Sequence, residues 1–167
     1  MSGAALSSGR RSQPMILKKD EQLMRLALAE AEEAGRMGEV PVGAVIVDGS
    51  GRVLSTGRNL RESSQNPTDH AEIIAIREAS RAMGSWRLEG AAIYVTLEPC
   101  MMCMGAIINA RIELLVFGAR DPKAGAVVSV MNPDDYVGLN HRVEWRESVL
   151  EEECSSLLRG FFRMLRT

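Results

Sequence analysis

Apolar side chains recur along the chain at two spacings, one typical of helices and one of strands. From position 23 to 34, leucines and alanines follow one another at intervals of three and four residues, which places them on one face of a helix. Asp20 is suited to cap the start of this helix and Gly35 to end it. The pattern therefore predicts a first amphipathic helix between these two residues.

Extended segments are predicted next. An apolar run at 42–47, the turn sequence D-G-S-G and a second extended run at 52–56 predict a β-hairpin. Loop residues fill 61–69, and later apolar runs predict strands at 92–97 and 114–118 and a short one at 143–145. The chain should therefore contain about five strands.

Helices are predicted between these strands. A helix that begins near His70 carries isoleucines on one face, and Gly84 is suited to end it. Pro99 is suited to the first turn of another helix, which runs to about Asn109, because a first-turn residue needs no N–H. A long amphipathic helix is predicted at 149–165.

This order of elements predicts an α/β fold. Strands separated by helices favour parallel pairing with helices on both faces, which gives a three-layer α/β/α domain with the hairpin at one side. We expect a mixed, mainly parallel sheet of about five strands. The length of 167 residues suits a single domain. Residues 1–19, rich in Ser and Gly at the start, are predicted to be a flexible N-terminal arm, and 20–167 to be the folded domain.

Composition narrows the function classes. A formal net charge of −2 gives no overall field that favours nucleic acid, so a polyanion would need a local basic patch. The chain has no apolar run of the roughly 20 residues that span a bilayer, and its first twenty residues lack the apolar core of a secretory signal. Three cysteines, two of them close together, suit a reduced compartment where thiols bind metal. We expect a soluble, cytoplasmic protein without a membrane partner.

Candidate chemistry is concentrated in two short motifs, H-A-E at 70–72 and P-C-M-M-C at 99–103. Cys100 and Cys103 are three residues apart, so both sulfurs project from one face of a first helical turn. His70 stands at the start of its own helix. Two thiolates and an imidazole are typical zinc ligands, and three protein ligands leave the fourth tetrahedral position to water. We predict one Zn²⁺ held by His70, Cys100 and Cys103.

Glu72 has a different predicted role. It lies two residues beyond His70, roughly 200° further around a helix, so it is badly placed to be a neighbouring ligand. Zinc lowers the pKa of bound water towards about 7, and a carboxylate beside that water is able to take its proton and return it to a ring nitrogen and a departing amine. This chemistry is hydrolytic deamination.

A closed, structural zinc site is the alternative, and it would need a fourth ligand such as Cys154 or His141. Cys154 shares its helical spacing with leucines, which favours a small buried apolar residue. His141 lies in a polar loop, which favours a surface or hydrogen-bonding histidine. The open site is therefore the preferred interpretation.

Both motifs resemble the zinc-dependent nucleoside deaminase superfamily, whose signature is H-x-E followed by P-C-x-x-C. A finer resemblance is to the bacterial tRNA-specific adenosine deaminase family. It rests on E-V-P-V-G-A-V at 39–45, G-R-N at 57–59, F-G-A-R-D-P-K-A-G-A at 117–126, G-L-N-H-R-V-E at 138–144 and F-F-R-M at 161–164. The resemblance implies a cytidine deaminase-like fold, a homodimer, zinc on the three predicted ligands, Glu72 as the proton shuttle, and conversion of the wobble adenosine of a tRNA anticodon to inosine.

Four residues are candidates for RNA contact, and each has an ordinary alternative. Asn59 matches the family's substrate-side asparagine and offers a donor and an acceptor to a purine or ribose, or it forms an Asx turn. Asp121 accepts a hydrogen bond from a ribose 2′-hydroxyl, or it serves as an N-cap or braces its own loop. Lys123 contacts phosphate or is merely solvated. Arg163 belongs to a positive stripe on the last helix that contacts RNA or forms a solvated face, together with Arg159 and Arg166.

The zinc motifs alone leave three functions open. These are a tRNA deaminase, a deaminase of a free cytosine or guanine compound, and a non-catalytic binding module stabilised by zinc. The motifs outside the zinc core favour the tRNA anticodon loop as substrate, with no DNA expected as a natural one. Asp69 departs from the family pattern, where a small residue is frequent, and it either orients His70 or caps the helix.

Overall fold

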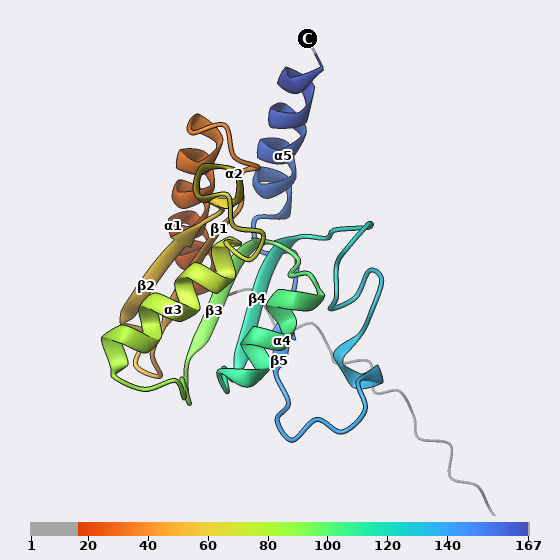
Figure 1. Cartoon of the computed structure of the whole chain (residues 1–167). Coiled ribbons are helices and arrows are strands. Elements are labelled where there is room, and N and C mark those ends of the chain that lie inside the picture. Colours follow the sequence, from red (N-terminus) through yellow and green to blue (C-terminus); the bar gives the residue numbers. More distant parts are fainter. Residues whose placement is uncertain (1–16, 167) are drawn as a thin grey trace, which may run out of the picture.

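The computed structural model describes residues 17–166, which form a five-stranded sheet in the order β2-β1-β3-β4-β5 (Figure 1). The strands are β1 (Gly43–Val47), β2 (Val53–Arg58), β3 (Ala92–Leu97), β4 (Leu114–Ala119) and β5 (Glu144–Arg146). β1 pairs antiparallel with both β2 and β3, whereas β3, β4 and β5 pair in parallel. The predicted mixed sheet with the hairpin at one side is confirmed. Its pairings divide evenly between the two types, because β1 is antiparallel to both neighbours.

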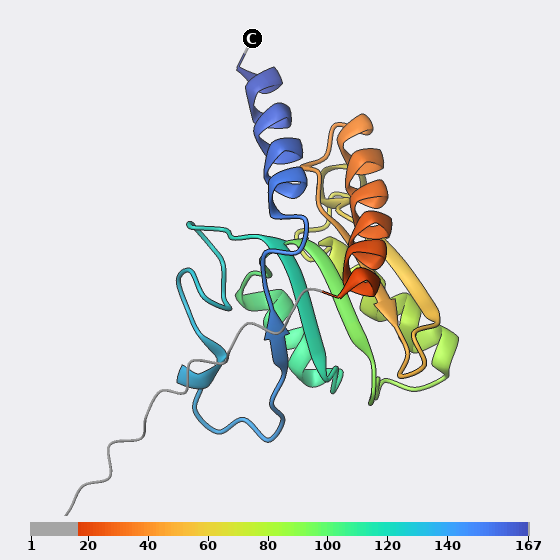
Figure 2. The same ribbon diagram turned by 180° about the vertical axis from the view of Figure 1, so that it is seen from behind.

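Helices cover both faces of the sheet. α1 (Lys18–Arg36) and α5 (Glu151–Leu165) lie on one face, and α3 (Ala71–Met83) and α4 (Met101–Asn109) lie on the other (Figures 1 and 2). Each face has its own apolar cluster, with Ala75 and Ile107 in one and Met24 and Val116 in the other. The predicted three-layer α/β/α domain is therefore confirmed. Within 17–166, no helix is both long enough and apolar enough to cross a membrane.

Three helices begin away from their predicted starts, and one of them is α5, which begins at Glu151 and not at residue 149. α1 begins at Lys18, two residues inside the predicted arm, and the rest of that arm lies outside the described residues. Asp20 is therefore within the first turn and is not the cap. α4 begins at Met101 with Cys100 at its N-cap, so Pro99 precedes the helix. Gly84 ends α3 in a left-handed conformation, as predicted.

Asp20 does not cap α1 because its carboxylate serves a buried cluster instead. Its side chain accepts a hydrogen bond of 2.8 Å from the Tyr94 hydroxyl and pairs with the Arg146 guanidinium. Burial and the bond to Asp20 raise the pKa of Tyr94. The cluster joins α1 to β3 and β5 across one face of the sheet, with Asp20 only 1% exposed.

We expect Asp20→Ala to lower the free energy of unfolding by about 3 kcal/mol, because it leaves the Arg146 charge partly buried and unpaired. Chemical denaturation followed by circular dichroism measures the change. Glu21→Ala, on the exposed side of the same turn, is the matched control and should stay within about 0.5 kcal/mol of the parent chain. Equal stabilities for the two variants would contradict the role assigned to Asp20.

Candidate active site

Two helix starts meet at one edge of the sheet. β2 and β3 run in the same direction, because each is antiparallel to β1, so the segments that follow them leave from the same edge. His70 occupies the N-cap of α3, and Cys100 occupies the N-cap of α4. A Cβ added to Gly57 on β2 would lie 2.3 Å from the Ala71 carbonyl oxygen, so the absence of a side chain there lets the first turn of α3 lie directly against β2.

The three predicted metal ligands come together at this edge. Nδ1 of His70 lies 3.7 Å from Sγ of Cys100 and 3.5 Å from Sγ of Cys103, and all three ligand atoms lie within 4.8 Å of one another. Tetrahedral zinc with Zn–S of about 2.3 Å and Zn–N of about 2.1 Å requires an S···N separation of about 3.6 Å. These side chains therefore form a group that is able to hold a metal ion.

The pKa values of the two sulfurs are shifted in opposite directions. Hydrogen bonds from the Cys103 thiol and from His70 lower the pKa of Cys100 to about 4, against the opposing effect of burial. The same thiol bond and burial raise the pKa of Cys103. The bond to Cys100 also raises the pKa of His70. The lowered pKa of Cys100 favours its thiolate, which is the form that binds metal.

A cavity of about 220 Å³ opens beside the ligands. Its apolar wall includes Val40, Val42 and Leu97, and its polar wall includes Asn59, Arg61, Glu72, Glu98 and Asp121, with His70 and Cys100 at the same cavity. The structure thus brings together the metal-binding group and three of the predicted site residues, Glu72, Asn59 and Asp121.

Glu72 is the buried carboxyl group of this cavity. The residue is 4% exposed, and burial is the main cause that raises its pKa. A carboxyl group with a raised pKa in a cleft is suited to exchange protons near neutral pH. Its position at the cavity supports the predicted proton shuttle, which stays a prediction.

Asn59 forms the Asx turn that was its alternative interpretation. Its Oδ1 accepts the backbone N–H of Arg61 at 3.1 Å, and its Nδ2 donates to the Val40 carbonyl oxygen at 3.2 Å. An amide has two donor hydrogens and two acceptor lone pairs, so this side chain keeps capacity for a molecule in the cavity. Contact with substrate therefore stays a prediction for Asn59.

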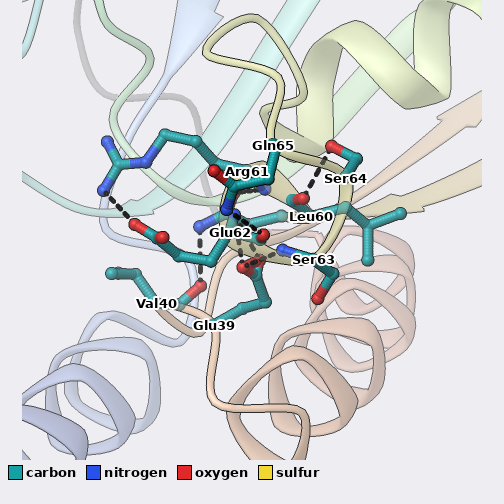
Figure 3. Close-up of polar contacts among 9 residues, drawn as sticks. Glu39, Val40, Leu60, Arg61, Glu62, Ser63, Ser64 and Gln65 are labelled. Carbon is teal, nitrogen blue, oxygen red and sulfur yellow. Dashed lines mark hydrogen bonds and ion pairs between the residues drawn. The ribbon is translucent and has the colours of Figure 1, made fainter.

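The wall beyond Asn59 is a short helix where only a loop was predicted. α2 (Arg61–Ser64) carries Arg61 to the cavity. Figure 3 shows the Glu39 carboxylate directed at the start of this helix, where it accepts the backbone N–H groups of Glu62 at 2.7 Å and Ser63 at 3.2 Å. Glu39 is fully buried. Sequence reasoning did not single out Glu39 or Arg61 as separate residues.

Asp121 and Glu98 form another part of the cavity lining. Oδ1 of Asp121 accepts the N–H groups of Lys123 and Ala124 at 3.1 and 3.3 Å, so the predicted loop-bracing alternative is present. Although burial opposes it, hydrogen bonds from Ser129 and from backbone N–H groups hold the pKa of Glu98 below its usual value. Sequence reasoning also left Glu98 without a role, although it directly precedes the P-C-M-M-C motif.

Lys123 and Arg163 lie outside this cavity, and they line a second hollow together. This basic hollow has a volume of about 410 Å³ and is lined by Lys123, Leu158, Arg159, Phe162, Arg163 and Arg166. Arg159 also pairs with Glu152 at 2.7 Å. The predicted RNA contacts therefore lie at two places. Asn59 and Asp121 line the cavity beside the metal-binding group, whereas Lys123 and Arg163 line the basic hollow at α5.

The remaining candidates have structural partners. Cys154 is buried, and burial raises its pKa to about 12, as expected of a small core residue. Nε2 of His141 is hydrogen-bonded to the Ile112 carbonyl oxygen at 2.8 Å, so it is the predicted hydrogen-bonding histidine. Asp69 pairs with Arg77 at 2.6 Å. It does not cap α3, because His70 occupies that position.

Comparison with known proteins finds deaminases that match most of the chain. The family model described as MafB19-like deaminase matches residues 18–166. The tRNA-specific adenosine deaminase of Bacillus subtilis is 49% identical over 150 residues, which span 90% of this chain and 92% of that protein. The tRNA-specific adenosine deaminase of Haemophilus influenzae is 47% identical and spans 88% and 85%.

Solved structures agree with the sequence matches. A structure from studies of A-to-I editing by tRNA:A34 deaminases is 44% identical, with a TM-score of 0.79, and covers 82% of this chain and 99% of that one. The guanine deaminase of Nitrosomonas europaea has a TM-score of 0.74 at 22% identity and covers 90% and 88%, which shows the shared fold alone. The chain belongs to the MafB19-like deaminases and, among them, to the family of tRNA-specific adenosine deaminases.

Proposed function

We propose that this protein is a hydrolytic deaminase that converts adenosine to inosine at the wobble position of a tRNA anticodon. The observation that carries the proposal is the buried Glu72 carboxyl group, which shares one cavity with His70 and Cys100. Similarity to tRNA-specific adenosine deaminases supports this substrate over a free base or nucleoside. The likeness to a guanine deaminase concerns the fold and gives that alternative no support.

The proposed cofactor is one Zn²⁺ per subunit. Two sulfurs and one imidazole nitrogen form a ligand set that suits zinc, and their separations fit its bond lengths. When bound there, zinc supplies Lewis acidity that makes water acidic enough to act as a nucleophile near neutral pH. His70, Cys100 and Cys103 would hold the ion.

Glu72 moves protons in this proposal. Its carboxylate takes a proton released by the attacking water, delivers it to the purine ring nitrogen next to the reacting carbon, and assists departure of the amine as ammonia. Burial favours the protonated carboxyl group, which suits the delivery step. Asn59 lies at the same cavity and is proposed to hold the base or its ribose through its remaining hydrogen-bonding capacity.

An anticodon loop suits the shape and charge of this region. Its bases are unpaired, so one of them is able to enter a cavity at little cost in base pairing. Asp121 is proposed to accept a hydrogen bond from a 2′-hydroxyl, which would select RNA over DNA. Arg61 brings a cation to the cavity, and the basic hollow offers Lys123 and Arg163 to backbone phosphates. Because tRNA is the proposed substrate, we place the protein in the cytoplasm.

The direct test is mass spectrometry of anticodon stem-loop RNAs after incubation with the protein, with zinc content measured in parallel. We expect replacement of the amine by oxygen at the wobble adenosine alone. Ammonia release from free adenosine, cytidine and guanine is followed under the same conditions. Turnover of a free compound without any change in the RNA would overturn the proposed substrate.

We expect Arg163→Gln to weaken RNA binding mainly at low salt. Loss of one phosphate contact should reduce the slope of log K against log salt concentration by about 0.7. Fluorescence anisotropy of a labelled stem-loop at several salt concentrations measures the slope. Arg81→Gln, which alters an arginine near the end of α3 that pairs with Glu78, is the matched control. A slope unchanged in both variants would remove Arg163 from the RNA contacts.

We also propose that the protein is a homodimer, as the family resemblance implies. Exposed apolar side chains on α4 and in the segment 130–139 offer a surface for a second copy, and they include Met101, Val130, Met131, Val137 and Leu139. Light scattering coupled to gel filtration tests this assembly. A monomer mass at micromolar concentration would contradict it.

A further inference from the structure

We propose that Glu98 is a positioning residue, which fixes the loop 121–129 against the segment before Cys100 and thereby sets the affinity of the cavity for RNA. This inference rests on the proposed function and deepens it. Glu98 would act through the loop and not through the reacting base, because both of its carboxylate oxygens are already occupied by hydrogen bonds from the protein.

The carboxylate of Glu98 holds both ends of the loop. Near the start, Oε1 accepts the backbone N–H of Asp121 at 3.1 Å. Near the end, Oε2 accepts the N–H groups of Val127, Val128 and Ser129 at 3.0, 2.9 and 3.0 Å. The Ser129 hydroxyl donates to Oε1. The segment is irregular, so these backbone N–H groups have no strand or helix partner. The Glu98 carboxylate accepts their hydrogen bonds instead.

Because Glu98 is buried, its carboxylate needs all of these hydrogen-bond donors. The residue is 2% exposed, and among residues 17–166 no ion pair involves it. A buried carboxylate without a cation depends on its hydrogen-bond donors to replace the lost hydration. The donors must therefore stay in place, which means that the loop has little freedom to move.

Gly125 shows how closely the loop follows the carboxylate. A Cβ added at this position would lie 2.3 Å from the Glu98 carboxyl carbon and 2.4 Å from each of its oxygens. No side chain fits there unless the loop or Glu98 shifts. The middle of the loop therefore packs against the Glu98 carboxyl group, and both ends of the loop donate hydrogen bonds to the same group.

The same loop forms one wall of the cavity beside the metal-binding group. Asp121 and Ala124 line the cavity, and the N–H of Ala126 donates to the Pro99 carbonyl oxygen at 2.8 Å, directly before Cys100. The N–H of Glu98 donates to the Ala119 carbonyl oxygen at 2.8 Å, where β4 ends. A change at Glu98 should therefore move the wall that carries Asp121, while the three metal ligands keep their own helices.

Glu98→Gln tests the inference with little change in side-chain shape. An amide nitrogen would face backbone N–H donors, so part of the loop loses its acceptor. We expect KM for the anticodon stem-loop to rise about tenfold or more, with kcat within about threefold of the parent chain. Zinc content should stay at one per chain, and hydrogen exchange should show faster exchange at the amides of Val127, Val128 and Ser129.

Three further variants keep the test decisive. Gly125→Ala presses on the carboxylate from the other side and should raise KM in the same way. Ser129→Ala removes one donor without adding bulk, so it should fold and raise KM about threefold. Glu113→Gln alters an exposed carboxyl group beyond the far end of α4. It is the matched control, and its KM and kcat should equal those of the parent chain.

The outcomes separate this inference from the proposed function. A parent chain that leaves all RNAs unchanged would overturn the proposed function, and hydrogen exchange would then decide the role of Glu98 without substrate. Unchanged exchange in Glu98→Gln, or an unchanged KM in an active enzyme, would overturn the inference. A lower melting temperature with no split between KM and kcat would reduce Glu98 to a structural residue. If Glu98→Gln fails to fold, Ser129→Ala decides by the same criteria.

Discussion

Replacement of Glu72 by glutamine should lower kcat for RNA deamination roughly a thousandfold, because general acid–base catalysis typically contributes 10²- to 10⁴-fold. The amide has nearly the same shape as the carboxyl group but neither takes nor returns the proton. KM should change little, since the substitution leaves the cavity walls in place. Single-turnover assays on the anticodon stem-loop measure the chemical step directly.

The same substitution should not destabilise the fold. Burial raises the pKa of Glu72, so the charged form is disfavoured in the folded state, and a neutral amide removes that cost. The melting temperature should therefore equal or exceed that of the parent chain at neutral pH, with zinc content unchanged. Glu78→Gln on the exposed side of the same helix is the matched control and should keep full activity. Turnover by Glu72→Gln at the parent rate would rule out its role as the proton shuttle.

The parts of the fold that depend on neighbours along the chain could be predicted from the sequence. The helix near His70, its end at Gly84 and the hairpin after α1 all follow from short-range spacing and turn residues. Asp20 resembles a helix cap on the same local grounds. Its partners, Tyr94 and Arg146, are 74 and 126 residues away. A local sequence pattern does not reveal partners so far along the chain, so the sequence did not predict that Asp20 is buried.

The candidate site divides in the same way. The metal-binding group was found because its ligand types and spacing are rare in combination. Glu39 and Glu98 were missed because their partners are backbone N–H groups, which every residue except proline has. The Glu39 carboxylate binds the start of α2 and the Glu98 carboxylate binds the loop 121–129, and both segments line the same cavity. This support for the site depends on the folded path of the backbone, and residue types alone do not reveal it.

Cys103→Ser should reduce zinc content well below one ion per chain and abolish deamination. A hydroxyl group stays protonated where a thiol becomes a thiolate, so it binds zinc weakly, and the two remaining ligands do not make a stable site. Removal of the metal from the parent chain by a chelator should give the same inactive state, and added Zn²⁺ should restore activity to the parent but not to the variant. Elemental analysis and stem-loop deamination are measured on the same samples.

A matched cysteine variant separates loss of a ligand from loss of a thiol. Cys154→Ala removes a buried cysteine that lies against Gly118 and belongs to the apolar cluster on the opposite face of the sheet from α4. It should lose stability by about 1 kcal/mol through poorer packing and still bind one zinc. Full zinc content and activity in Cys103→Ser would show that the ion is held elsewhere. Loss of zinc in Cys154→Ala would mean that the third cysteine belongs to the metal site, and the open coordination position required for hydrolysis would then be filled.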